Sequence, residues 1–146
     1  MAGLDDFAKR LDRIAVRVEG NVERAVKGCA QVVLRSVVEG TPVDTGKARS
    51  NWTPELDRAF EGLFPARVPG IKGSTGDTNS VATIEAGAPV IEAFNIRENR
   101  EIHITNNAGH IQALNDGHSQ QAPADFVRIA VLEGLATVRG AKIVEE

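Results

Sequence analysis

Residues 4–40 read LDDFAKRLDRIAVRVEGNVERAVKGCAQVVLRSVVEG, and their apolar side chains recur at steps of three and four. Such spacing places the apolar residues on one face of an α-helix, while Lys, Arg, Glu and Gln fill the opposite face. The sequence therefore predicts one long amphipathic helix. Its apolar face comprises Leu4, Phe7, Leu11, Ile14, Val18, Val22, Cys29, Val33 and Val37.

Nothing in this pattern stops the helix before Gly40, Thr41 and Pro42, which together form an ordinary helix terminator. Gly20 and Gly28 weaken the interior and mark either a bend or a close contact. A helix of roughly 35 residues is about 50 Å long, far above the usual three turns. A chain of 146 residues cannot cover such a rod, so part of its apolar face is expected to meet another chain.

The remaining sequence predicts short elements around a small, mostly antiparallel sheet. The prediction is an α+β fold in a single domain over residues 1–146, with the N-terminal and C-terminal helices packed on the sheet. Gly and Pro without periodicity indicate a flexible loop at about 60–79. The elements are a helical turn and a strand within 47–56, a helix over 81–95 split at Gly87 and Pro89, a strand over 101–105, a short helix around 111–114 and a helix over 125–138.

Composition excludes several classes of function. A net charge of −3 and a pI near 5.7 argue against a dedicated nucleic-acid binder, leaving at most weak contact with DNA. The single cysteine, Cys29, falls on the apolar helix face and is predicted to be a buried small hydrophobe. No stretch approaches the roughly 20 apolar residues of a membrane span, and the first residues do not resemble a signal peptide, so a soluble protein is expected.

The three histidines, His103, His110 and His118, are the residues to test as metal ligands or bases. Their spacing matches no zinc signature, and a histidine that supports a tight turn looks the same. Neither Ser119 beside His118 nor Thr45 beside Asp44 sits in a nucleophile elbow. We predict no catalytic, cofactor-binding or metal-binding residue. The alternatives are a small metal-dependent hydrolase that uses the late histidines, or a cytoplasmic binding module.

Two segments resemble tail-component proteins of long-tailed bacteriophages. Residues 41–52, TPVDTGKARSNW, are similar to that family's TPVDTG-(R/K)-x-R-x-(S/N)-W motif. Residues 104–123, ITNNAGHIQALNDGHSQQAP, are similar to its (I/V)-x-N-x-x-x-Y-(A/I)-x-x-L-(E/N)-x-G-(H/T/W)-S-x-Q-A-P motif. His110 stands where the family usually has Tyr, which puts detailed contacts rather than the fold in doubt.

The resemblance implies a non-enzymatic structural protein of the virion neck or tail, acting in tail completion or head–tail joining. It implies a ring on the tail axis, for which six subunits are favoured. The implied partners are the tail terminator, the tail tube or the head–tail connector, with synthesis in the host cytoplasm. The matching residues, predicted to fix turns and to present the subunit interface, are Asp44, Thr45, Gly46, Trp52, Asn106, Asn107, His110, Gly117, His118, Ser119, Gln121 and Pro123.

Overall fold

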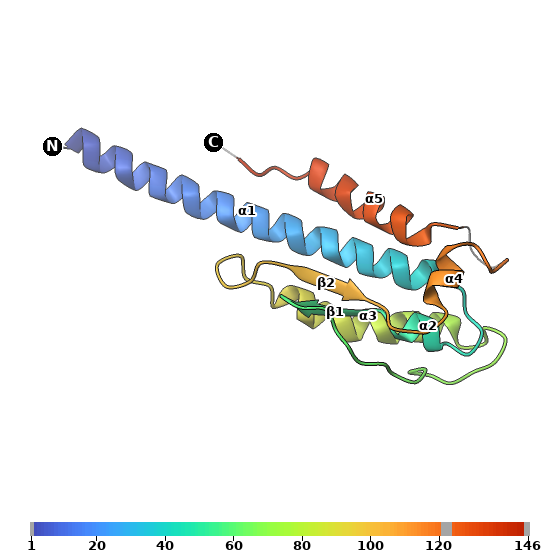
Figure 1. Cartoon of the computed structure of the whole chain (residues 1–146). Coiled ribbons are helices and arrows are strands. Elements are labelled where there is room, and N and C mark those ends of the chain that lie inside the picture. The colour runs from blue at the N-terminus through green and yellow to red at the C-terminus, as the bar shows by residue number, and fades with distance from the viewer. Residues whose placement is uncertain (1, 121–123, 145–146) are drawn as a thin grey trace.

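The computed structural model describes residues 2–120 and 124–144. Its first element is a single uninterrupted helix, α1, over Ala2–Gly40 (Figure 1). The long helix predicted from the sequence is thus confirmed, and neither Gly20 nor Gly28 interrupts it. An added Cβ at Gly28 would meet nothing within 4 Å, so that glycine marks no close contact.

The other elements are short, and the α+β class is confirmed. The two strands form one antiparallel sheet whose register pairs Thr53 with Thr105 and Leu56 with Ile102. The elements are α2 (Lys47–Ser50), β1 (Thr53–Leu56), α3 (Gly76–Glu92), β2 (Ile102–Thr105), α4 (Ile111–Asn115) and α5 (Phe126–Arg139).

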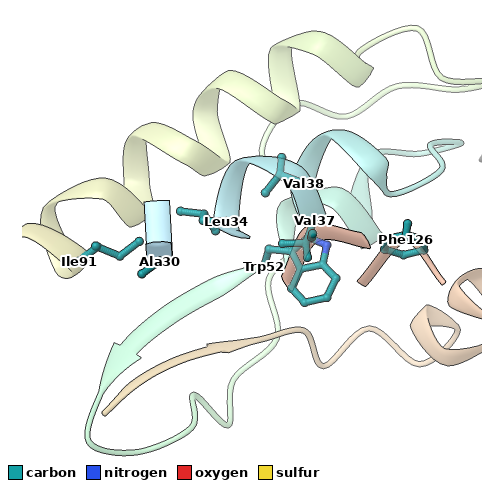
Figure 2. Packing of buried hydrophobic residues seen from close by; sticks show 8 residues of the cluster. Ala30, Leu34, Val37, Val38, Trp52, Ile91 and Phe126 are labelled. Atoms are coloured by element: carbon teal, nitrogen blue, oxygen red, sulfur yellow. The ribbon is translucent and has the colours of Figure 1, made fainter. Parts of the chain in front are cut away.

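The C-terminal half of α1 forms the centre of the molecule. α5 lies along one side of α1 and runs antiparallel to it, while the sheet, α2 and α3 lie on the other side (Figure 1). Figure 2 shows how the core gathers side chains from all of these layers. Its buried members are Ala30, Leu34, Val37, Val38, Trp52, Ile91, Phe126 and Ala130.

The helix α3 differs from the helix that the sequence predicts over 81–95. α3 begins at Gly76, so the irregular segment covers residues 57–75 and Asn79 lies in a helix. α3 also runs through Gly87 and Pro89 instead of splitting there. Gly87 is buried so tightly that an added Cβ would lie 2.7 Å from Leu34 and 3.0 Å from Pro54, and this packing keeps the helix together. The carbonyl of Pro89 still accepts the amide of Ala93 at 3.0 Å, so the last turn closes.

Cys29 is free and half-buried rather than fully buried, and burial raises the pKa of its thiol. Its Sγ lies beside Gly134 of α5, where an added Cβ would approach it to 3.1 Å. Cys29 therefore contributes to the packing of α1 against α5. Among the described helices, none combines the length and hydropathy that crossing a lipid bilayer requires.

Replacing Gly28 with Ala should raise the free energy of unfolding by about 0.5–1 kcal/mol, because Ala restricts the unfolded chain and favours the helix. The site has room for the methyl group. Chemical denaturation followed by the fluorescence of Trp52 measures the change. Gly134→Ala is the matched control: its Cβ would lie 2.5 Å from Val33, so this helical substitution should destabilise. A destabilised Gly28→Ala variant would show that α1 needs this glycine.

Candidate functional site

The segment Thr41–Trp52 follows the end of α1, and most of its residues are buried. The hydroxyl of Thr41 donates to the carbonyl of Val37 at 2.5 Å and accepts the indole N–H of Trp52 at 2.7 Å. One hydroxyl thereby pairs a carbonyl of the last helical turn and the polar atom of a buried indole, both of which would be costly to leave unpaired. Trp52 is in this way joined to α1 by a hydrogen bond as well as by packing (Figure 2).

Arg49 supplies the cap that α1 itself lacks, since the last turn of α1 contains no basic residue. Its Nη2 donates to the carbonyl of Thr41 at 2.7 Å and to that of Glu39 at 3.2 Å, while its Nη1 donates to Ser80 Oγ at 3.0 Å. Partial burial lowers the pKa of Arg49, and the nearby carboxylates of Asp77 and Glu39 oppose that shift. The guanidinium stays charged and complements the partial negative charge at the helix end.

Asn79 of α3 connects this segment to the irregular residues 57–75. Its Oδ1 accepts the hydroxyl of Ser50 and the amide of Val68, each at 2.8 Å. Its Nδ2 donates to the carbonyl of Val68 at 2.8 Å and to the carbonyl and hydroxyl of Thr75 at 2.9 and 3.0 Å. The side chain is fully buried, so its amide is satisfied entirely by protein groups from three parts of the chain.

The turn over Asp44, Thr45 and Gly46 lies against the irregular residues 57–75. Asp44 Oδ1 accepts the amide of Lys72 at 2.9 Å, and the carbonyl of Asp44 accepts the amide of Gly73 at 2.9 Å. Gly46 has φ of +89°, and an added Cβ would lie 2.3 Å from Asn79 Nδ2. Only glycine combines this backbone conformation with this approach.

Asn51 and Ser50 bond the middle of the irregular segment. Asn51 Nδ2 donates to the carbonyl of Phe64 at 2.8 Å, and its Oδ1 accepts the amide of Phe64 at 2.7 Å. The amide of Arg67 donates to Ser50 Oγ at 3.1 Å. The backbone of residues 57–75 is therefore tied to Thr41–Trp52 at several points, while its predicted flexibility stays a prediction.

Asn106 and Asn107 connect the second motif to two other parts of the chain. Asn106 Nδ2 donates to the carbonyl of Ala48 at 2.7 Å, and its Oδ1 accepts the amide of Ala108 at 3.0 Å. Asn107 Nδ2 donates to the carbonyls of Phe60 and Gly62 at 2.8 and 2.9 Å. Asn106 thus ties the segment after β2 to the first motif, and Asn107 ties it to the irregular residues 57–75.

Gly117 ends α4 in a Schellman motif. It has φ of +90°, its amide donates to Leu114 at 3.2 Å, and the amide of His118 donates to Ala113 at 3.1 Å. The side chains of His110 and His118 are exposed and Ser119 is half-buried, whereas Gln121 and Pro123 lie outside the described residues.

Side chains of metal-binding type do not gather in the described structure. Within residues 2–120 and 124–144, no three His, Cys, Asp or Glu side chains lie close enough together to hold a metal ion. His103 lies 2.6 Å from the carboxylate of Glu101. The described motif side chains instead bond mainly to backbone groups and to each other, which positions helices and turns.

Sequence reasoning missed the residues that carry most of this network. Arg49, Ser50 and Asn51 lie inside the quoted motif, so their polar character beside Trp52 was the available signal. No sequence pattern indicated the role of Asn79, because its partners come from segments that are distant in sequence and irregular.

Replacing Gly117 with Val should lower the free energy of unfolding by about 1–3 kcal/mol, because a β-branched residue resists a positive φ. The added Cβ would also lie 3.1 Å from that of Ala124. We expect loss of folding or assembly, measured by denaturation and by particle size. Gly109→Val is the control, since its Cβ would meet nothing within 4 Å. Normal assembly of Gly117→Val would contradict a structural role for this turn.

The comparison with known proteins covers the first motif in full and the second as far as Gly117. The family model described as bacteriophage HK97-gp10, putative tail-component, matches residues 5–117, a range that runs from α1 to the end of α4. No curated protein and no solved structure matches the chain. The resemblance noted in the sequence is confirmed, and the match covers most of the 146 residues. The chain therefore belongs to the HK97-gp10-like family of bacteriophage tail components, which implies a structural role in the tail of the virion.

Proposed function

We propose that the protein is a non-enzymatic subunit of the phage neck or tail, acting in tail completion or head–tail joining as a ring on the tail axis. Six subunits suit the proposed position. The motif side chains of Thr41 and Arg49, together with Asn79 of α3, support a structural role, because they are engaged in hydrogen bonds that position helices. Side chains used in this way hold the shape of a subunit.

One observation carries the proposal of self-association. The N-terminal part of α1 extends far beyond the rest of the subunit (Figure 1), and the large apolar side chains that it carries are exposed. Leu4 is 70% exposed and Phe7 is 60% exposed. A monomeric protein rarely leaves a contiguous apolar face in water, whereas an interface covers it.

The proposed neighbours in the virion are the tail terminator, the tail tube or the head–tail connector. The net charge of −3 favours protein partners and allows at most weak contact with passing DNA. Synthesis in the host cytoplasm and incorporation during assembly complete the proposal.

Two experiments test this function. Light scattering of the purified chain should give a particle several times the 15.6 kDa of one subunit. Electron microscopy of particles made without the protein should show unjoined heads and tails, or tails of abnormal length, and supplying the wild-type chain should restore them. Complete, infectious particles made in its absence would overturn the proposed role.

A further inference from the structure

The backbone of β2 has hydrogen-bonding groups that point away from its partner strand. The amide of Asp57 donates to the carbonyl of Glu101 at 2.9 Å, which continues the observed register of β1 with β2 as a hydrogen-bonded pair. Bonded and non-bonded pairs alternate along an antiparallel ladder, so His103 is bonded to β1 in the same way. The N–H and C=O groups of Ile102 and Ile104 therefore point outward, away from β1.

The two edges of the sheet differ in whether they can take a further strand. On β1 the outward position is held by Pro54, which has no N–H to donate and so blocks pairing at that edge. α3 also packs against β1, with Gly87 close to Pro54. On β2 none of the described residues bonds the outward backbone groups of Ile102 and Ile104. The sheet can therefore be extended at β2 alone.

An apolar groove of about 330 Å³ lies beside this open edge. β2 is the strand nearer to α1 in Figure 1, and the groove is enclosed by α1, β2 and the end of α5. Among the described residues no charged side chain lines it; the lining includes Val26, Cys29, Val33, Ile102, Ile104 and Val138. Cys29 is only half-buried where it lines the groove, so the apolar residues of α1 lack a complete cover here.

The open edge and the groove together specify what would cover them. A row of free backbone donors and acceptors is matched by the backbone of another extended segment, which adds to the sheet as a further strand, whereas a helix would leave these groups unpaired. The side chains of Ile102 and Ile104 pack toward the core, and every second side chain of an added strand would point the same way, into the groove. The occupant is therefore an extended segment with apolar residues at alternate positions and no proline where it pairs.

The irregular segments of this chain that carry several apolar residues are already engaged in their own subunit. Residues 57–75 contain Pro65 and Pro69 and are bonded by Asn51 and Ser50. In residues 140–144, after α5, the carbonyl of Ile143 accepts Asn21 Nδ2 at 2.8 Å. We propose that β2 accepts an extended segment of a different tail protein as a third strand, an inference that rests on the proposed place of this chain in the tail.

Hydrogen exchange, read residue by residue by mass spectrometry, compares the purified chain with the same chain in complete virions. The amides of Ile102 and Ile104 should exchange freely in the purified chain and at least about tenfold more slowly in virions, because each gains a hydrogen bond. The amides of His103 and Thr105 point toward β1, so they are internal controls and should be protected in both samples. The thiol of Cys29 should react with a maleimide in the purified chain and be shielded in virions.

Two variants of α5 test the groove itself. Val138→Lys places a charge in the groove, and Leu132→Lys is the matched control that places the same charge on α5 outside it. Val138 is 37% exposed and Leu132 is 53% exposed, so both variants should fold, which denaturation followed by Trp52 fluorescence checks. Supplied to phage made without the chain, Val138→Lys should yield about tenfold fewer infectious particles or worse, while Leu132→Lys should match the wild type.

Three results would overturn this strand addition. Free exchange of Ile102 and Ile104 in virions would show that the edge of β2 stays open there. Protection of both amides already in the purified chain would mean that a second copy, and not a different protein, supplies the strand. Full rescue by Val138→Lys would show that the groove stays empty. The proposed tail function is judged separately, by whether particles made without the chain are complete, so the two failures are distinguishable.

Discussion

Replacing Gly46 with Ala is expected to lower the free energy of unfolding by about 3 kcal/mol or more. Two costs add. An L-residue is strained at the φ of +89° that this position adopts, and its Cβ would lie 2.3 Å from Asn79 Nδ2. Because the amide of Asn79 is bonded on all sides, it cannot move away without leaving buried groups unpaired. Denaturation followed by Trp52 fluorescence measures the loss.

Gly109→Ala is the matched control for this substitution. Gly109 has open space around an added Cβ, so its replacement should change stability by a few tenths of a kcal/mol at most. A Gly46→Ala variant as stable as the wild type would show that the turn over Asp44–Gly46 adapts, and the packing described for it would be wrong.

Replacing Asn79 with Ala is expected to cost about 3–5 kcal/mol, because several buried groups lose their partners together. The amide and carbonyl of Val68 and the hydroxyl of Ser50 all depend on this side chain. Asn107→Ala is the matched control: Asn107 also bonds two backbone carbonyls, but it is exposed, so water replaces its amide. Similar losses from the two variants would contradict the importance of burial.

A double variant with both Gly46→Ala and Asn79→Ala separates the backbone strain at position 46 from the steric clash with Asn79. Without the Asn79 amide, a methyl group at position 46 no longer meets Nδ2, and only the backbone strain remains. The double variant should therefore lose less stability than Gly46→Ala and Asn79→Ala lose together, as expected for residues in contact. Strict additivity would mean that the close approach of these residues does not limit stability.

α1, the strands and α5 were predictable because each depends on a periodic pattern along the chain. Leu4 to Val37 keep helical spacing, and Ile102 and Ile104 alternate with polar residues. The start of α3 was not predictable, because its first turns carry polar residues such as Asn79 and Ser80 that become buried only by bonding to distant segments. Gly87 likewise suggested a break in the helix, because its close contact with Leu34 and Pro54 joins residues that are distant in the sequence.

The candidate site was predictable only as far as the motifs reach. The motifs led to Gly46 and Trp52, and they placed Gly117 among the residues that fix turns, where the structure gives it a positive φ. The role of Arg49 as the cap of α1 depends on a chain reversal that brings a side chain back eight residues to Thr41. Such a contact follows from the geometry of the turn and leaves no periodic trace in the sequence.

The continuity of α1 has a consequence for how its exposed residues 3–17, the arm, remain helical in water. A separate helix of about 15 residues is marginal in water, because its first turn must nucleate before hydrogen bonds accumulate. The arm avoids that step, since it extends a helix already nucleated by the packed residues from Asn21 to Val38. Its helicity therefore depends on propagation alone, and fraying begins at the free end. Amide protection should decline smoothly toward Gly3 in the free subunit, and a neighbour would meet an arm that is already largely ordered.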